Sequence, residues 1–334
     1  MSDAVGARRR VLLLSGLAAF ALSAYGADSE SVRLDRVVFV GPGDTIVEEE
    51  RAKVIADFAS EGLLMGRHIT IEWAEGIGFG DPWPPEAERR AREIVATHPA
   101  VILAPGNKIH IFRKVTKEIP LVFFYLGRDP VEWGLVETYG HPGGNITGAG
   151  FPLGEDTFKV IELLKEFRPE ARRIGTVLWS DEIDPTSLLY SKWRRSAATK
   201  LGLEYVEIVL APSGSFASLI PSAIRRARLD LYLGGTLPEV REFLVRAHIP
   251  FTGDAHKGGL CSVYASWDEN LQSAISIASQ VLRGAKPADI PVRFPSKYDT
   301  IINLRTAREM GLAIPSSALI RATVVIDESG KERR

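Results

Sequence analysis

The sequence predicts an α/β fold of two lobes, each built around a largely parallel β-sheet. Short runs of β-branched residues alternate with amphipathic segments of helical period along most of the 334 residues, which is typical of consecutive βαβ units. The order of strand, loop, helix and Ile-Pro strand over residues 100–125 returns over residues 229–254, which indicates two equivalent lobes. A further helix and strand beyond residue 265 are too few for a third domain. We therefore expect them to cross between the lobes as part of a three-segment hinge.

Predicted strands and helices alternate in both halves of the chain. In the first half, strands are expected over 36–40, 69–73, 100–104, 121–125 and 146–150, with helices over 46–62 and 85–97. In the second half, strands are expected over 173–179, 204–210, 230–234, 250–252 and 260–264, with helices over 186–201, 216–228 and 238–247. An amphipathic helix is expected over 269–282. It ends before Gly284, which is followed by Lys286-Pro287 and Ile290-Pro291, and a strand is expected over 300–304.

These elements predict the domain boundaries. Residues 32–147 together with 262–292 are expected to form lobe 1, and residues 148–261 together with 293–327 are expected to form lobe 2. The helix over 269–282 would then pack on lobe 1 and the strand over 300–304 on lobe 2.

Residues 1–26 have the layout of a secretory signal peptide. Three arginines at 8–10 precede an apolar run from Val11 to Ala24, and the small residues Ala24 and Gly26 suit a cleavage site. The run is shorter than the roughly 20 apolar residues that span a bilayer, although an uncleaved anchor is the alternative. Adjacent arginines also permit twin-arginine export. Cleavage after Gly26 would change the net charge from −1 to −3 and place the mature chain outside the cytoplasm, most simply in a bacterial periplasm.

The composition excludes several classes of protein. Lys and Arg number 41 against 42 Asp and Glu, so the chain lacks the basic excess that binding to a phosphate backbone needs, and no nucleic-acid partner is expected. The single cysteine, Cys261, cannot form an internal disulfide or a thiolate zinc site. The fold must therefore be stabilised by packing.

The sequence lacks the motifs that are typical of catalytic or cofactor-binding sites. It contains no GxSxG, HExxH or P-loop pattern, and no two of the six histidines stand at i and i+4. The loop that begins at Gly41 fails the dinucleotide fingerprint because Ile46 stands where the third glycine is needed. We therefore expect no catalytic residue, no metal site and no cofactor.

The loops that follow the strands carry the candidate ligand-binding residues, because open α/β sheets bind ligands beyond the carboxyl ends of their strands. In lobe 1 these are Asp44, Thr45, Gly106, Asn107, Arg128, Asp129 and Phe151. In lobe 2 they are Asp184, Ser187, Thr236, Asp254 and Tyr264. An anionic group of the ligand would face Arg128, and an amine or hydroxyl would face Asp129, Asp44 or Asp254.

Each of these candidates also has a structural interpretation. Asp44, Thr45, Asp184 and Thr236 stand where helix N-caps are common. The Arg128-Asp129-Pro130 run equally suits an ion pair that opens a surface turn. Aromatic residues near strand ends, such as Phe151 and Tyr264, pack into cores as readily as they stack on ligands.

Two groups of motifs resemble the substrate-binding proteins of ABC transporters, in the tryptophan/tyrosine-binding type family. The first group is Asp129-Pro130-Val131, Gly134-Leu135-Val136 and the HPGGNITG run over 141–148. The second group is Ile249-Pro250-Phe251, the LRGAKPADIPV run over 282–292 and IINL over 301–304. The chain departs from the family pattern at Arg128, at Glu132-Trp133 and over 265–268, so the resemblance does not transfer a particular ligand.

The resemblance implies a type I periplasmic binding protein with two Rossmann-like lobes, a three-segment hinge and a ligand cleft between the lobes. It further implies solute capture for ABC import by hinge closure, with a small organic molecule and the membrane permease subunits as partners. We expect an amino-acid-like or aromatic and anionic ligand, a monomer, and no enzymatic activity. The alternatives are a periplasmic sensing module that presents its solute to a receptor, and an exported enzyme on the same fold.

Overall fold

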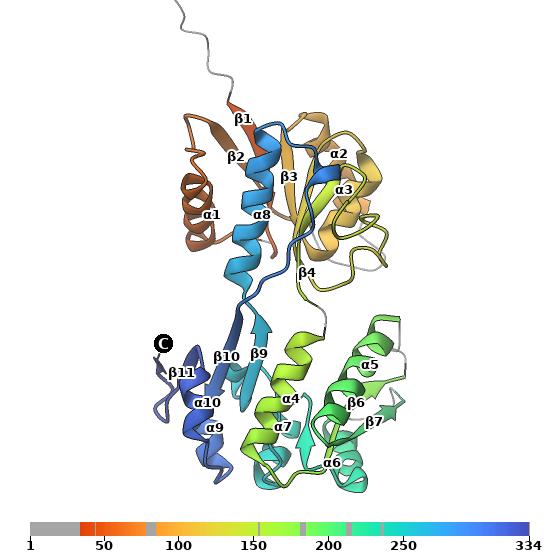
Figure 1. The fold of residues 1–334 in the computed structure, drawn as a ribbon, viewed down its shortest axis with the longest axis vertical. Coiled ribbons are helices and arrows are strands. Elements are labelled where there is room, and N and C mark those ends of the chain that lie inside the picture. Colours follow the sequence, from red (N-terminus) through yellow and green to blue (C-terminus); the bar gives the residue numbers. More distant parts are fainter. Residues whose placement is uncertain are drawn as a thin grey trace, which may run out of the picture.

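The structure, a computed structural model, consists of two lobes stacked end to end (Figure 1). It describes residues 34–43, 45–77, 85–152, 154–180, 185–211, 216–234 and 237–333. Lobe 1 is the upper lobe in Figure 1 and lobe 2 is the lower one. The predicted signal peptide, residues 1–26, lies outside the described residues.

Lobe 1 is built on a five-stranded parallel sheet. Its strands are β1 (Asp35–Val40), β2 (Ile69–Ala74), β3 (Val101–Pro105), β4 (Leu121–Leu126) and β5 (Ile146–Gly150). They lie in the order β2-β1-β3-β4-β5, and every neighbouring pair is parallel. The carboxyl ends of all these strands therefore meet at one edge of the sheet, which is where such sheets bind ligands.

Helices cover both faces of the lobe 1 sheet, because the strands are apolar on both sides. Val37 and Phe39 pack on one face with α1 (Glu48–Ser60) and α8 (Trp267–Leu282). Val38 and Val40 point to the other face and pack with α2 (Pro85–Ala96) and α3 (Ile109–Val115). Two short 3-10 turns, η1 (Gly106–Lys108) and η3 (Pro287–Asp289), complete the lobe.

Lobe 2 combines a parallel sheet with a mixed one. The parallel sheet has the order β7-β6-β8 and the mixed sheet has the order β12-β11-β10-β9. Isolated bridges from Tyr232 to Phe251 and from Thr252 to Cys261 connect the two sheets. The strands are β6 (Arg173–Trp179), β7 (Glu204–Leu210), β8 (Leu231–Tyr232), β9 (Cys261–Ala265), β10 (Tyr298–Asn303), β11 (Val324–Ile326) and β12 (Glu332–Arg333).

The helices of lobe 2 surround these strands and share one apolar core with them. They are α4 (Glu155–Phe167), α5 (Pro185–Lys200), α6 (Phe216–Ala227), α7 (Pro238–Arg246), α9 (Leu304–Glu309), α10 (Ser316–Arg321) and the turn η2 (Ala255–Lys257). The predicted two-lobed α/β fold is confirmed, although α4 falls where the sequence analysis named no element. Within the part of the chain that the structure describes, every helix is too short or too polar to cross a membrane.

Three segments cross between the lobes, each a few residues beyond its expected boundary. The first crossing follows Gly150 and not residue 147, because β5 stays paired with β4 up to that residue. The second follows Ala265, since β9 pairs with β10 in lobe 2 before α8 begins in lobe 1. The third follows Phe294, which still packs on the lobe 1 core. In each case strand pairing or packing continues past the point where the sequence pattern changes.

Asn270, in the first turn of α8, ties the end of β4 to the end of β5. Its side chain is fully buried. The Oδ1 atom accepts a hydrogen bond from the Tyr125 amide at 2.9 Å, and the Nδ2 atom donates to the Gly150 carbonyl at 2.9 Å. The pairing of β4 with β5 is irregular between Phe123 and Leu126, so Asn270 satisfies two backbone groups that this bulge leaves without ladder partners.

Glu269, the residue before Asn270, binds the third crossing segment. Its carboxylate accepts hydrogen bonds from the Ser296 amide at 3.0 Å, the Ser296 hydroxyl at 2.9 Å and the Lys297 amide at 2.7 Å. The Ser266 amide donates to the Lys297 carbonyl at 2.9 Å. Adjacent residues at the start of α8 thus hold all three crossing segments together at the base of lobe 1.

Replacement of Asn270 by alanine is expected to lower the free energy of unfolding by about 2–4 kcal/mol, because it leaves a buried N–H and a buried C=O unpaired. Urea unfolding of the two proteins measures the difference. The matched control is Gln272→Ala, an exposed position on the same helix, which should change stability little. An Asn270→Ala protein as stable as this control would contradict the account.

Candidate functional site

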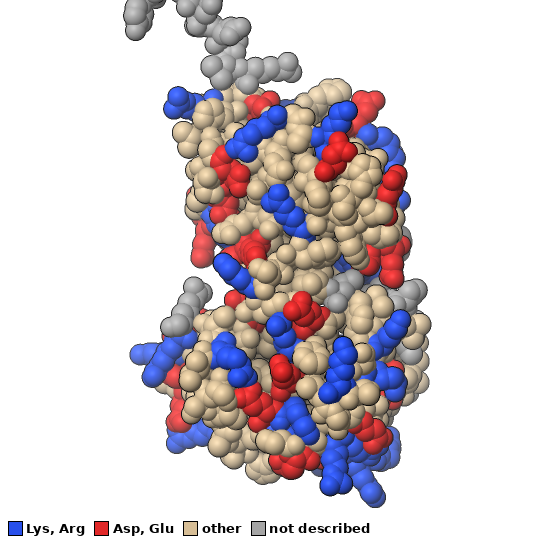
Figure 2. Space-filling view, in the orientation of Figure 1, with Lys and Arg blue, Asp and Glu red and all other residues tan. Residues whose placement is uncertain are grey.

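The facing edges of the two lobes bring most of the predicted ligand-binding residues to one region of the molecule. The lobe 1 edge carries Thr45, Gly106, Arg128, Asp129 and Phe151, each just after a strand of the parallel sheet. Figure 2 shows the surface narrowing where the lobes meet, with basic and acidic residues interspersed over both lobes. Asp44, Asp184 and Thr236 lie outside the described residues, as do the side chains of Asn107 and Ser187.

A buried lysine holds the loop after β1 against the loop after β3. Lys108 is 1% exposed, and its ammonium donates to the carbonyls of Gly41 at 2.8 Å and Gly43 at 2.9 Å. Charge-assisted hydrogen bonds of this kind offset the cost of burying a cation. Lys108 therefore fixes the loop that leads to Thr45, a role that sequence reasoning missed.

Thr45 itself is exposed and does not cap α1. The N-cap of that helix is Val47, whose side chain forms no capping hydrogen bond. The turn is held instead by Glu75, whose Oε1 accepts from the Ile46 amide at 3.0 Å and from Arg51 at 2.6 Å. The hydroxyl of Thr45 therefore faces solvent at the edge of lobe 1.

Arg128 belongs to a stack of three side chains at the end of β4. Its guanidinium carbon lies 5.0 Å from the centroid of the Trp133 ring, and the His110 ring meets the same indole edge-to-face at 4.0 Å. Arg113 donates to the Trp133 carbonyl at 3.1 Å and so fixes the position of this residue. The cation–π contact orients the Arg128 guanidinium at the lobe edge.

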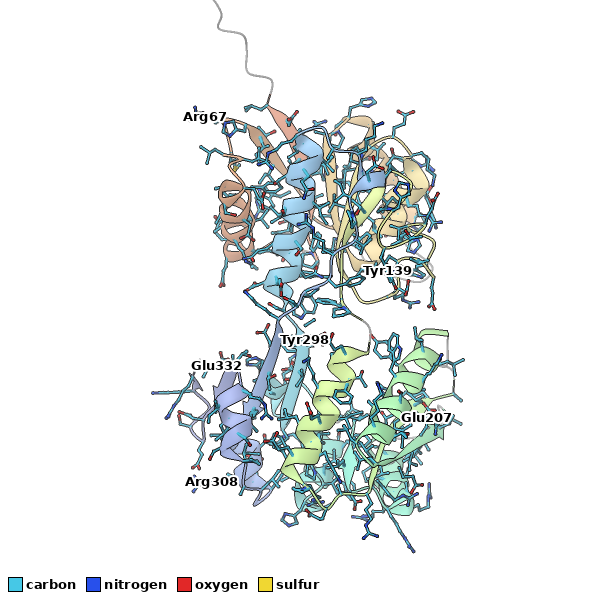
Figure 3. The ribbon with its side chains drawn as sticks, viewed as in Figure 1. Arg67, Tyr139, Glu207, Tyr298, Arg308 and Glu332 are labelled. Atoms are coloured by element: carbon cyan, nitrogen blue, oxygen red, sulfur yellow. The ribbon has the colours of Figure 1, made fainter. Side chains whose placement is uncertain are left out.

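Asp129 organises the turn that follows. Its Oδ1 accepts from the amides of Val131 at 2.8 Å and Glu132 at 3.1 Å, and its Oδ2 accepts from the Tyr139 hydroxyl. Figure 3 shows Tyr139 at the edge of lobe 1 that faces lobe 2. In this structure Asp129 makes the contacts of a residue that holds a turn. A contact between its carboxylate and a ligand stays a prediction.

Three aromatic rings form a cluster at the base of lobe 1, which we call the aromatic corner. It consists of Tyr125 from β4, Phe151 after β5 and Trp267 at the start of α8. Tyr125 and Phe151 are parallel within 4° at 6.1 Å, and Trp267 lies 4.4 Å from the first ring and 5.0 Å from the second. Trp267 keeps 46% of its surface exposed, so part of its indole is accessible to solvent.

Only Phe151 of these rings was among the predicted site residues. Tyr125 was assigned to a strand and lies in β4 as expected, where its backbone adopts φ +54° within the irregular pairing with β5. This conformation is unfavourable for a residue other than glycine, and such strained residues are concentrated at functional sites. Trp267 gave one signal in the sequence, since residues 265–268 depart from the Gly-containing turn of the family pattern.

On lobe 2 the predicted residues Asp254 and Tyr264 are both engaged in local structure. Asp254 caps η2 by accepting from the His256 amide at 3.1 Å, and it pairs with Lys257 at 3.2 Å. Burial acts to raise the pKa of the Asp254 carboxyl, but Lys257 and the amide donors outweigh it and hold that pKa below its ordinary value. Tyr264 packs on a small apolar cluster with Ala255, and burial raises the pKa of its hydroxyl.

The Nδ1 atom of His256 lies 2.9 Å from a carboxylate oxygen of Glu332, and this contact ties the C-terminal strand β12 to the loop. On the neighbouring segment the Gly234 amide donates to the Thr252 hydroxyl at 2.9 Å.

Over the described ranges, His, Cys, Asp and Glu side chains form no group of three that could hold a metal ion.

The stack at Arg128 predicts a pH dependence of stability. Burial, followed by the charges of Arg113, Lys114 and Arg128, lowers the pKa of His110 to about 4. The unfolded imidazole titrates near about 6.5, so between these values the unfolded chain binds a proton that the folded chain does not. The free energy of unfolding should therefore fall as the pH drops from about 6.5 towards about 4.

Urea unfolding at several pH values checks this, with His110→Gln compared with the native chain and with His141→Gln, an exposed control in the same lobe. The pH-dependent loss should be smaller in His110→Gln and unchanged in the control. An identical pH profile for all three proteins would show that His110 does not carry the effect.

Comparison with known proteins shows a similarity to one family over part of the chain. Residues 84–228 match the model of the family described as ABC transporter substrate binding protein. A relative from Clostridioides difficile (strain R20291), named tyrosine-binding protein, is 27% identical over 228 residues, which cover 66% of this chain and 64% of the relative. The chain thus spans slightly less than two thirds of that relative's length.

Solved structures show the same two-lobed arrangement. The ligand-free, open structure of a substrate-binding protein with adhesive properties from Clostridium difficile gives a TM-score of 0.72 at 21% identity, covering 85% of this chain and 97% of that one. An ABC domain from Streptococcus pneumonia in complex with L-Trp gives 0.65 at 22% identity, covering 87% and 99%. The fold is that of type I periplasmic binding proteins, and the chain is similar to ABC transporter substrate-binding proteins, as its motifs predicted.

Proposed function

We propose that this chain is the extracytoplasmic solute-binding component of an ABC import system. The observation that carries the proposal is the aromatic corner, whose partly exposed indole lies at the start of α8 and whose Tyr125 precedes Arg128 by three residues. A planar apolar surface and a guanidinium at the same edge of lobe 1 suit a small organic solute with an aromatic or apolar part and an anionic group. The match to the family model and the tyrosine-binding relative support an amino-acid-like solute.

The solute would be held between the two lobes. Lobe 1 would contribute the aromatic corner, Arg128 and the loop that Lys108 holds, together with Thr45, Gly106, Asn107 and Asp129. Lobe 2 would contribute the loops that contain Asp184, Ser187, Thr236, Asp254 and Tyr264. Because these residues come from both lobes, a bound solute favours the arrangement in which the lobes are close together.

Hinge closure is therefore the mechanism that we propose for capture. Rotation of lobe 2 about the three crossing segments would bring its strand ends towards the aromatic corner. A solute that contacts both lobes in the closed state has a higher affinity for that state and shifts the population towards it. Membrane permease subunits would recognise the closed, loaded form, and the protein would act as a monomer in the periplasm without transforming its solute.

A thermal-shift screen of the exported chain against amino acids, aromatic acids, nucleosides and sugars tests the function. A compound that binds only the folded state stabilises it by about 2.7 kcal/mol at 100 times its Kd, and so raises the unfolding midpoint. We expect a hit among amino acids or aromatic acids, which chromatography recovers unchanged after incubation. Chemical conversion of the hit would favour an exported enzyme. An unfolding midpoint that no compound of any class raises would contradict the proposal.

Replacement of Arg128 by alanine should weaken binding of the identified solute by about 10- to 100-fold, because a charge-assisted hydrogen bond to its anionic group is lost. Isothermal titration calorimetry measures the affinities. Arg67→Ala is the control, since Arg67 is exposed at the far end of lobe 1 (Figure 3). Equal affinity of the Arg128→Ala protein and the control would remove Arg128 from the site.

A further inference from the structure

Arginines gather at the end of lobe 2 that lies away from lobe 1. Helix α4 begins next to the first crossing and runs to the lower end of lobe 2 in Figure 1, so the segment that follows it, residues 168–173, lies at that end. Figure 2 shows Lys and Arg side chains gathered at this lower end, below α6. The end is therefore remote from the facing edges of the two lobes.

Hydrogen bonds place the segment after α4 beside the segment after α6. The Asp230 carboxylate accepts from the amide of Arg172 at 2.7 Å. Two residues before Asp230, the Arg228 amide donates to the Arg225 carbonyl at 3.1 Å, where α6 ends. The side chains that these segments bring to one end of the lobe, which we call the arginine end, are those of Arg172, Arg225, Arg226 and Arg228.

The side chains of the arginine end are exposed and have no acidic partner. Within the part of the chain that the structure describes, none of the four forms an ion pair. Arg225 instead lies over the Phe243 ring, with its guanidinium carbon 4.8 Å from the ring centroid. By contrast, the neighbouring Arg173 pairs with Glu204 at 3.0 Å. The arginine end therefore carries surplus positive charge, although the net charge of the whole chain is −1.

The helix dipole accounts for only part of this arrangement. Arg225 and Arg226 stand in the last turn of α6, where a cation is stabilised by the dipole of the helix. Arg172 stands in the loop before β6, outside any helix, so the dipole does not explain its position. Nor does a helix dipole require that all four cations lack carboxylate partners.

The chemistry of the arginine end suits a lipid surface better than a protein surface. Protein interfaces bury apolar anchors at their centre. The large apolar side chains that are exposed on the described part of lobe 2 stand in α5, β7 and α10 and before α7; they are Leu188, Val209, Leu237 and Ile320. Guanidinium groups pair well with phosphates, and a leaflet of anionic phospholipids presents negative charge over a whole plane.

We infer that the arginine end is a docking surface for a membrane that contains anionic phospholipids. The guanidinium groups of its four arginines would pair with the lipid phosphates. Attraction of this kind falls off within a Debye length, about 10 Å at 0.1 M salt, so the arginine end must face the membrane. Because this end lies at one extreme of the long axis of the molecule, the facing edges of the two lobes stay away from the membrane surface (Figure 1).

Co-sedimentation of the exported chain with phosphatidylcholine vesicles, prepared with and without phosphatidylglycerol, tests the inference. Each arginine that faces an anionic leaflet should strengthen binding about five-fold. The double variant Arg172→Gln, Arg226→Gln should therefore bind the phosphatidylglycerol vesicles about 25-fold more weakly than the native chain. An increase in salt from about 0.1 M to about 1 M should release the native chain, because the Debye length falls to about 3 Å.

The matched control is Arg89→Gln, Arg92→Gln on α2 of lobe 1, which changes the net charge equally. These arginines are exposed and pair with Glu93 and Glu88, so the control should bind as the native chain does. Urea unfolding checks that both double variants are folded.

Three results would overturn the docking surface. The first is native binding that phosphatidylglycerol does not increase, including no binding to either kind of vesicle. The second is a loss of binding that is absent from the Arg172→Gln, Arg226→Gln protein or equally large in the control. The third is binding to a DNA duplex as tight as binding to the phosphatidylglycerol vesicles, because the arginine end would then attract any polyanion.

Discussion

The pair of residues Glu269 and Asn270 at the start of α8 determines how the rest of the molecule is arranged. Asn270 bridges the ends of β4 and β5, and Glu269 binds the amides of Ser296 and Lys297. These hydrogen bonds join all three crossing segments at one point, so lobe 2 is attached to lobe 1 at a fixed origin. The motion between the lobes that we propose would then occur below this point, in the segments that continue into lobe 2 (Figure 1).

The hydrogen bonds of Asn270 also shape the proposed site. Because Asn270 completes the β4 bulge, Tyr125 adopts its left-handed conformation and its ring packs with Phe151 and Trp267. The corner therefore forms where the ends of β4 and β5 meet the start of α8, beside the crossing segments. A solute bound here would contact the crossing segments directly, which would link solute recognition to the closure that we propose.

The sequence was sufficient to predict most of the strands, the two lobes and the crossing helix, because buried parallel strands require apolar runs and their helices require a matching period. It predicted the loops that carry Arg128 and Phe151 for the same reason. It could not predict the role of Asn270, whose partner Tyr125 is 145 residues away.

The central claim is that a solute bound between the lobes draws them together about the three crossing segments. Small-angle X-ray scattering of the exported chain, with and without a saturating concentration of its solute, tests this claim most directly. The account predicts a smaller radius of gyration and a shorter maximum dimension in the presence of the solute. Identical scattering curves at demonstrated saturation would show that binding does not close the lobes, and would contradict it.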